Sequence, residues 1–466
     1  MLTYSFAGRQ NEPLYEYLYR RIKEDIMSGE IPVGERLPSK RALARQLGVS
    51  TITVEGAYGQ LAAEGYVQSI PKKGYFAADM RSTAVLSPEI REENICSAEA
   101  KPKYFADFTA NNVTASDFPL RTWSRLQRDC IKEKADALLE RTSVHGAPAL
   151  REAIALHLKR FRGLVVSPEQ IIIGAGTEYL YSMLVQLLGR EKIFCTEDPG
   201  YGKIRRIYEA NGAKCLSVAM DESGIQVRQI EACGADVVHI SPSHQFPTGI
   251  VMPAHRRYEL LAWASKGERY IIEDDYDSEF RLTEKPLPTL MGIDASDTVI
   301  YMNTFSKSLA ATIRISYMVL PLSLLEAFEE KMGFYSSPVS SFEQYTLAKF
   351  MQEGFFEKHI NRMRNRYRRR RDSLLAAIKQ STWQDNVQIM EESAGLHFML
   401  KFQTALSDRE LKERLQQQGI ALRALKEYYL QPAPEAEHVF VMNYSHIREE
   451  IMKEAINRIG RALNGA

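Results

Sequence analysis

At 466 residues the chain is too long for one ordinary domain, and we expect it to form two or three. Its composition is globular, and a net charge of only +1 excludes nucleic-acid binding through overall charge, so any such contact needs a local patch. Five scattered cysteines without a C-x-x-C pair argue against a disulfide scaffold and against a metal site. Without a secretory signal or about 18 consecutive apolar residues, the sequence predicts a cytoplasmic protein with no membrane partner.

The first segment, residues 10–78, shows three helical patterns followed by a hairpin. Apolar residues four apart in PLYEYLYRRIKEDIMSGE predict the first helix. LPSKRALARQLG and STITVEGAYGQL predict two more, with Ser39 and Ser50 as N-caps. GYVQSIPKKGYFA predicts two short strands joined at PKKG. This order is typical of a winged helix-turn-helix, in which the second helix of the pair enters the major groove.

Charge gives this interpretation moderate support. Residues 36–73 contain six basic and two acidic residues, although the chain is otherwise balanced. Basic side chains of this kind supply affinity for phosphates, whereas contacts with base edges supply the choice of sequence. The pattern alone leaves a second interpretation open, namely a small helical domain with a solvated basic face.

The same segment resembles the GntR family of bacterial winged-helix regulators. The resemblance is carried by the LPS-x-R-x-LA entry to the second helix, the GVS turn, and the L-x-x-EGY exit into the wing. It implies that the partner is double-stranded promoter DNA. The residues implied to contact DNA lie at the two helices and in the wing: Arg41, Ser50, Thr51, Thr53, Lys72, Lys73 and Gly74.

Residues 79–103 have no apolar period and carry several charges, so they are predicted to form a linker. In residues 104–466, short apolar stretches alternate with helical patterns, which predicts a mostly parallel sheet with helices on both faces. Ligands bind such sheets beyond the carboxyl ends of the strands. The motifs GAGTE, EDPGY, SPSHQFPTG, EDDYD and TFSKS each follow a predicted strand.

These motifs contain the groups that an aldehyde cofactor with a pyridine ring and a phosphate requires. Lys307 follows a strand and can form an imine, and EDDYD offers four carboxylates for the ring nitrogen. Tyr276 can reach the phenolic oxygen if strand alternation points it the same way as Asp274. The helix start after GAGTE provides free N–H groups for the phosphate, and Tyr201 can stack on the ring. Thr304, Ser306 and Arg314 add further phosphate ligands.

The segment also resembles the class I aminotransferases of fold type I, through HGAPALREAIALHLKRFRG, GAGTEYL, EDPGY, FPTG, EDDYDSEF and TFSKSLAATIRISY. The resemblance implies pyridoxal 5′-phosphate on Lys307, a smaller C-terminal α+β subdomain and a homodimer. It implies Asp274 at the pyridine nitrogen, Tyr276 at the phenolic oxygen and Tyr201 stacked on the ring. The residues implied to hold the phosphate are Gly176, Thr177, Glu178, Thr304, Ser306 and Arg314.

A GntR-like head followed by an aminotransferase-like body resembles the MocR subfamily of transcription regulators. This implies that a small amino acid or other primary amine displaces Lys307, forms an external aldimine, and changes how the body holds the DNA readers. Two alternatives are an active aminotransferase with an accessory DNA head, and a regulator whose body has lost the cofactor. As a sensor, the body is expected to have no catalytic residue apart from the Schiff-base lysine.

Two departures from the aminotransferase pattern weaken the enzyme hypothesis. Phe246 stands where class I enzymes usually have the asparagine of NPTG. The late segment VFVMNYSHI lacks the arginine that usually holds the substrate carboxylate. Arg423 is the nearest replacement and Lys203 is a second candidate, although each is equally well explained as a surface residue.

Residues 358–371 contain eight Lys or Arg and no acidic residue. One interpretation is a long solvated helix whose Ile360, Met363 and Tyr367 face inward. The other is a second patch on the body that neutralises phosphates of flanking DNA.

Overall fold

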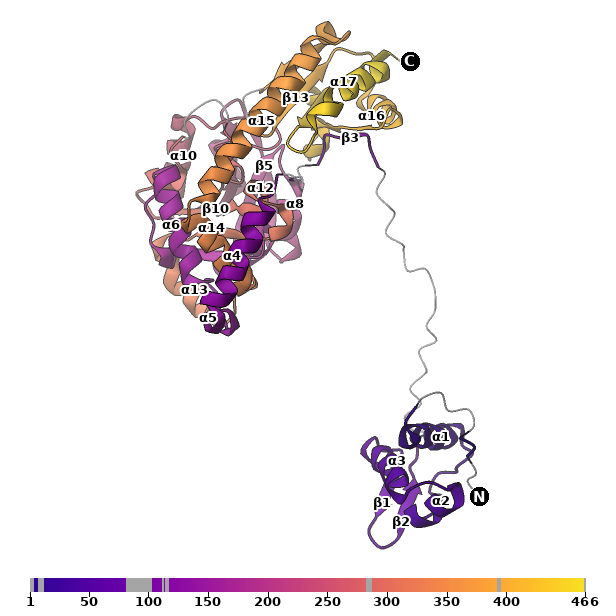
Figure 1. The fold of residues 1–466 in the computed structure, drawn as a ribbon. Coiled ribbons are helices and arrows are strands. Elements are labelled where there is room, and N and C mark those ends of the chain that lie inside the picture. The colour runs from indigo at the N-terminus through magenta and orange to yellow at the C-terminus, as the bar shows by residue number, and fades with distance from the viewer. Residues whose placement is uncertain are drawn as a thin grey trace. The chain divides into compact units, whose positions relative to one another are not determined.

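The structure is a computed structural model that describes residues 4–6, 12–80, 103–110, 113, 117–281, 287–391 and 395–464. These residues form two compact units, one within residues 1–101 and one within 102–466 (Figure 1). The predicted linker, residues 79–103, falls almost entirely outside the described residues. Within the described part of the chain, no helix is long and apolar enough to cross a membrane.

The N-terminal unit is a winged helix-turn-helix, as predicted. Its elements are α1 (Leu14–Ser28), α2 (Lys40–Leu47), α3 (Thr51–Ala63) and the antiparallel hairpin of β1 (Val67–Ile70) and β2 (Gly74–Ala77). The apolar stripes of the three helices meet in one core that includes Leu18, Leu43 and Tyr58. An amphipathic helix of this length is stabilised mainly by such packing.

The ends of these helices follow from local chemistry. Ser39 caps α2 by accepting a hydrogen bond from the N–H of Ala42, and Ser50 caps α3 by accepting one from Thr53. Gly29 and Gly48 end α1 and α2 in the left-handed conformation, which glycine adopts without steric strain. The predicted N-caps Ser39 and Ser50 are therefore confirmed.

The C-terminal unit is built on an eight-stranded sheet in the order β4-β11-β10-β9-β8-β5-β6-β7. Five neighbouring strands, from β10 to β6, are parallel, whereas β11 and β7 run antiparallel to their neighbours. The strands are β4 (Ile171–Gly174), β5 (Ile193–Asp198), β6 (Lys214–Asp221), β7 (Gly224–Ile225), β8 (Val237–Ile240), β9 (Tyr270–Asp274), β10 (Val299–Thr304) and β11 (Ser316–Val319).

Helices cover both faces of this sheet, because successive residues of a strand point to opposite sides. In β4, Ile172 packs in the core that α7 (Thr177–Leu188) and α13 (Leu325–Met332) share, whereas Ile171 and Ile173 pack in the core that α6 (Pro148–Arg162) and α14 (Ser341–Gln352) share. The helices before the C-terminal sheet are α4 (Leu120–Glu133), α5 (Ala135–Leu139), α6 (Pro148–Arg162), α7 (Thr177–Leu188), α8 (Gly202–Ala210), α9 (Val227–Cys233), α10 (Ala254–Ala264), α11 (Leu290–Ile293), α12 (Phe305–Ser308), α13 (Leu325–Met332), α14 (Ser341–Gln352) and α15 (Phe355–Lys379).

A smaller α+β part follows, as expected, with the sheet order β12-β13-β16-β15. Its strands are β12 (Val387–Met390), β13 (His397–Phe402), β15 (Arg423–Ala424) and β16 (Val439–Asn443). Helices α16 (Asp408–Gln417) and α17 (Glu449–Asn464) belong to this part, and α15 packs along α17 (Figure 1). The short strand β14 (Ile420–Ala421) pairs with β3 (Ala106–Asp107) at the start of the unit.

The basic stretch 358–371 lies on α15. Its predicted inward residues, Ile360, Met363 and Tyr367, are buried in the main core, which confirms the helical interpretation. Two of its arginines, however, also form contacts inside the protein. Arg366 and Arg370 form ion pairs with the fully buried Asp117. These arginines therefore neutralise a buried carboxylate, and a role of this stretch at DNA stays a hypothesis.

Candidate functional site

The motifs that the sequence singled out meet at one edge of the large sheet. Gly176 follows β4, Asp274 ends β9, and Lys307 follows β10 on the short helix α12. Strands β9 and β10 are parallel neighbours, so their carboxyl ends lie side by side. This is the edge at which open α/β sheets bind ligands.

Lys307 lies in a setting that favours its neutral amine. It is largely shielded from solvent, and this burial lowers the pKa of its amine to about 8, whereas Asp277 and Asp274 act in the opposite direction. The helix α12 that carries Lys307 is held by α15, because Nε2 of His359 lies 2.7 Å from the carbonyl oxygen of Ser308. An amine with a lowered pKa is a better nucleophile near neutral pH.

Asp274 is buried with one carboxylate oxygen engaged and one left over. Tyr181 on α7 donates its hydroxyl hydrogen to Oδ2 over 2.6 Å, and Nε2 of His239 lies 3.4 Å from the same oxygen. Oδ1 is buried and has no hydrogen-bond partner among the described residues. A buried acceptor without a donor is costly, so this oxygen fits the protonated ring nitrogen of a pyridine cofactor.

Tyr276 lies beyond the end of β9, so a turn rather than strand alternation places it beside Asp274. Its hydroxyl lies 3.4 Å from Nδ1 of His244, which in turn lies 2.7 Å from Oδ2 of Asp277. Burial holds the pKa of the Tyr276 phenol well above its usual range. Sequence reasoning did not name His244, although it lies within the motif SPSHQFPTG, and it offered Asp277 only as one of four carboxylates for the ring nitrogen.

The residues predicted to hold the phosphate include the start of α7. Gly176 has φ 92° and no side chain caps the helix, so its first N–H groups remain available to an anion. Arg314 reaches this turn and donates to the carbonyl oxygen of Ala175 over 3.3 Å. On the other side, Thr304 caps α12 by accepting from the N–H of Ser306. Thr177, the first residue of α7, completes the set.

The carboxylate of Glu178, a residue predicted to help hold the phosphate, is engaged by two cations, so its backbone N–H in the first turn of α7 is the group left for an anion. Its carboxylate forms ion pairs with both Lys203 and Arg314, and all three side chains are about half exposed. A carboxylate repels a phosphate, so these contacts indicate a residue that orients the two cations. Lys203, predicted to bind an effector, is engaged by Glu178 here.

Aromatic side chains form the rim of the site. Tyr201, 49% exposed, meets Phe246 edge to face with ring centroids 6.2 Å apart, and Phe246 meets Tyr428 at 5.2 Å. The guanidinium of Arg423 lies over the Tyr428 ring, 5.5 Å from its centroid. The predicted effector residue Arg423 is therefore connected to the predicted ring-stacking residue Tyr201 through two aromatic rings.

The residues predicted to contact DNA share one region of the N-terminal unit. Arg41 is exposed on α2, while Ser50, Thr51 and Thr53 lie at the start of α3, with Ser50 and Thr53 joined through their hydroxyls over 2.8 Å. The two helices are tied by an ion pair of 2.6 Å between Lys40 and Glu55. The wing residues Lys72 and Lys73 lie in the β1–β2 turn, and Gly74 begins β2.

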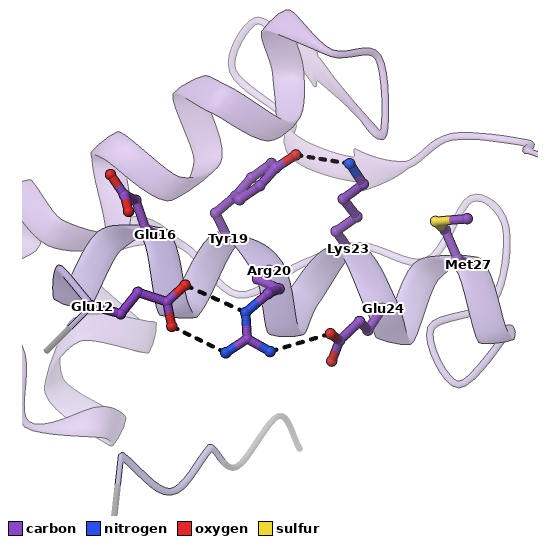
Figure 2. Close-up of a pocket in the computed structure, with 7 residues that line it drawn as sticks. All are labelled: Glu12, Glu16, Tyr19, Arg20, Lys23, Glu24 and Met27. Atoms are coloured by element: carbon purple, nitrogen blue, oxygen red, sulfur yellow. Dashed lines mark hydrogen bonds and ion pairs between the residues drawn. The ribbon is translucent and has the colours of Figure 1, made fainter. Parts of the chain in front are cut away.

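A shallow pocket on α1 lies outside both the predicted cofactor site and the predicted DNA-contacting residues (Figure 2). Arg20 lies between Glu12 and Glu24, at 3.0 Å and 3.3 Å, and Lys23 contacts the hydroxyl of Tyr19. These charges neutralise one another, and none of the residues predicted to contact DNA or cofactor lines the pocket. It is lined by Glu12, Glu16, Tyr19, Arg20, Lys23, Glu24 and Met27.

Comparison with known families matches both units. Residues 14–76 match the bacterial regulatory proteins of the gntR family, and residues 105–459 match the aminotransferases of class I and II. Over 97% of its length the chain is 30% identical to the probable rhizopine catabolism regulatory protein MocR of Rhizobium meliloti, of which 94% is covered. The protein belongs to the MocR subfamily of GntR-type transcription regulators.

Two further relatives span nearly the whole chain. The transcriptional regulator YdeL of Bacillus subtilis (strain 168) is 39% identical, with 97% of this chain and 96% of that protein covered. The pyridoxine biosynthesis transcriptional regulator PdxR of Corynebacterium glutamicum is 30% identical, with 96% and 95% covered. This MocR-type protein is thus a transcription regulator with an aminotransferase-like unit.

Solved structures bear out the fold of the larger unit. The multiple substrate aminotransferase of Thermococcus profundus superposes with a TM-score of 0.68 at 21% identity, covering 79% of this chain and 92% of that one. The kynurenine aminotransferase of Pyrococcus horikoshii gives 0.66 at 22% identity, covering 78% and 92%. At these identities the likeness establishes the fold of this MocR-type protein and not its chemistry.

Proposed function

We propose that this regulator binds pyridoxal 5′-phosphate in its aminotransferase-like unit, senses a small amino acid or related primary amine there, and changes its binding to promoter DNA in response. One observation carries the proposal. Lys307, whose pKa burial lowers to about 8, stands near Asp274, whose Oδ1 is buried without a partner among the described residues. DNA binding alone does not account for a buried amine with a lowered pKa beside a buried carboxylate oxygen without a partner.

Each part of the cofactor has a matching group. When bound, pyridoxal phosphate supplies an aldehyde carbon to which a primary amine can attach. Lys307 would hold that carbon in the resting protein, and Asp274 would accept the proton of the ring nitrogen. Tyr276 would donate to the phenolic oxygen, and Tyr201 would cover the ring. The phosphate would be held by the start of α7 at Gly176 and Thr177, and by Thr304, Ser306 and Arg314.

The effector proposed here is a primary amine that carries a carboxylate. The amine group must be primary, because only then can it take the place of Lys307. Arg423 is exposed at the rim and would bind the carboxylate of the effector. Lys203 would contribute a second positive charge to that carboxylate if its ion pair with Glu178 opened. A carboxylate held from β15 would lie differently from one held by the late-segment arginine of the enzymes. Such a complex would persist without turnover, which suits a sensor.

We further propose that the regulator is a homodimer that works in the cytoplasm, where its DNA lies. Phe334 and Tyr335 stack on each other at 4.3 Å, yet they are 73% and 42% exposed. Leu139, 82% exposed, precedes by four residues Ser143, which forms an isolated β-bridge with Ser336 beside Tyr335. An exposed apolar patch of this kind marks an interface, and a second copy of the chain is the partner that class I aminotransferases would use.

A spectroscopic experiment tests the proposed function. The purified protein is expected to be yellow, and borohydride is expected to fix the cofactor to the peptide that contains Lys307. A panel of amino acids and amines is then screened for shifts in the cofactor absorbance, alongside sequencing of the bound promoter DNA. Labelling of another lysine would contradict the assignment, as would a protein that takes up no cofactor. Steady production of a keto acid from an amino acid would instead establish a working aminotransferase.

A further inference from the structure

Behind Asp274 lies a chain of buried polar side chains that the proposed function has not used. His239 is the third residue of β8 and Tyr208 lies on α8. These two residues are 2% and 0% exposed, and Asp274 is 5% exposed. The hydroxyl of Tyr208 lies 2.6 Å from Nδ1 of His239, and Nε2 of the same ring lies 3.4 Å from Oδ2 of Asp274.

The chemistry of the three groups sets the direction of this chain. Burial holds the pKa of the Tyr208 phenol well above its usual range, so the hydroxyl keeps its proton and can donate it. When it donates to Nδ1 of His239, the hydrogen of the neutral imidazole stands on Nε2 and faces the carboxylate. The opposite tautomer would set the lone pair of Nε2 against those of Asp274. Tyr208 thus selects the tautomer that makes His239 a donor to Asp274.

Two donors from different elements therefore converge on one oxygen of Asp274. Tyr181 reaches Oδ2 from α7, and His239 reaches the same atom from β8. The rings hold one another in place, because Tyr181 meets His239 edge to face at 5.0 Å and Phe194 lies 4.6 Å from Tyr208. Because Oδ2 is held in this way, rotation of the carboxylate is restricted, and Oδ1 is the oxygen left without a partner among the described residues.

We propose that Tyr208 and His239 are positioning residues for the cofactor: they hold Asp274 so that Oδ1 faces the protonated ring nitrogen. The inference rests on the proposed function, since it needs a cofactor with such a nitrogen. A carboxylate with fixed orientation binds a donor without first losing rotational freedom, in the way that outer hydrogen-bond partners orient the ligands of a metal.

The test uses the full-length protein stripped of cofactor and titrated with two ligands. One is pyridoxal 5′-phosphate, and the other is its analogue with C–H in place of the ring nitrogen, which offers Asp274 no proton. Three variants are compared with the wild type. His239→Leu removes the donor, His239→Gln keeps an N–H near the position of Nε2, and Tyr208→Phe removes the group that selects the tautomer. Thermal unfolding of each variant accompanies the titrations.

We expect His239→Leu to weaken pyridoxal phosphate binding about 10-fold or more, as for a lost hydrogen bond to a charged group, and to change analogue binding less than about 2-fold. His239→Gln should recover most of the loss, and Tyr208→Phe should weaken pyridoxal phosphate binding and spare the analogue. Equal losses for both ligands, or none for either, would overturn the proposal. A wild-type protein that binds neither ligand would instead refute the proposed function itself.

Discussion

The guanidinium of Arg314 occupies the space that a side chain on Gly176 would need. A Cβ at this position would lie 2.5 Å from Nη2 of Arg314, closer than real Cβ contacts allow. Gly176 also has φ 92°, a conformation that other residues adopt only with strain. A side chain at Gly176 would therefore be strained by the backbone and would displace the Arg314 guanidinium, and both effects concern the proposed phosphate cradle.

Replacing Gly176 by alanine should impair cofactor binding more than stability. The positive φ is expected to lower the free energy of unfolding by about 1–3 kcal/mol. Displacement of Arg314 should add a loss of about 10-fold or more in affinity for pyridoxal phosphate, measured by absorbance titration. Gly163→Ala is the matched control, because Gly163 has φ 67° and open space around its Cβ position. If both variants bind the cofactor like wild type, Arg314 is not a phosphate ligand.

The lowered pKa of Lys307 predicts a pH dependence of cofactor uptake. Only the unprotonated amine attacks an aldehyde. Because the pKa of Lys307 is lowered from 10.5 to about 8, half of its amine is unprotonated at a pH of about 8. The rate of uptake by cofactor-free protein should rise with pH up to about 8 and level off above it. Stopped-flow absorbance measures this rate, with Lys307→Ala as the blank. A rate that still climbs tenfold per pH unit beyond pH 9 would contradict the burial of the amine.

Arg41→Ala should weaken operator binding without affecting cofactor uptake. Arg41 is exposed on α2 of the N-terminal unit, and a lost base contact corresponds to about 1–3 kcal/mol. Footprinting titration measures the affinity. Arg20→Ala serves as control, since Arg20 lies on α1 and is paired with two acidic residues. Equal affinities of the wild type and Arg41→Ala would refute the proposed docking of this helix.

Arg423→Ala should weaken the response to the true effector. Loss of a charge-assisted pair with the carboxylate corresponds to about 1.5–3 kcal/mol, or a roughly 10- to 150-fold higher effector concentration at half response. The cofactor spectrum reports this shift. Arg409, 88% exposed on α16 of the same subdomain, provides the control variant Arg409→Ala. A response at wild-type concentrations would place the carboxylate site elsewhere.

Where local chemistry decides structure, the sequence was sufficient. Ser39 and Ser50 cap their helices through their own side chains, and Gly48 ends a helix without steric strain. The parallel strands were predictable because each is short, apolar and followed by a polar loop. The edge at which Asp274 and Lys307 meet follows from that topology alone.

Contacts between distant residues were not predictable in this way. In the sequence, the arginines of α15 have the pattern of a solvated helix face. Their partner Asp117 lies about 250 positions earlier in the chain, and only the fold brings it beside them. His239 resembles an ordinary strand residue, because nothing local indicates that Tyr208 will meet it. Glu178 lies in the expected motif, yet its partners Lys203 and Arg314 come from two other segments, and they determine what its carboxylate can do.

We propose that an amine acting at Lys307 controls DNA binding. The most direct measurement is the affinity of the full-length protein for its promoter DNA, with and without the amine identified by absorbance, in wild type and in Lys307→Ala. We predict that the amine changes the wild-type affinity by about 5- to 150-fold, the usual range for coupled sites, and leaves the affinity of Lys307→Ala unchanged. An equal response of both proteins to the amine would contradict the account.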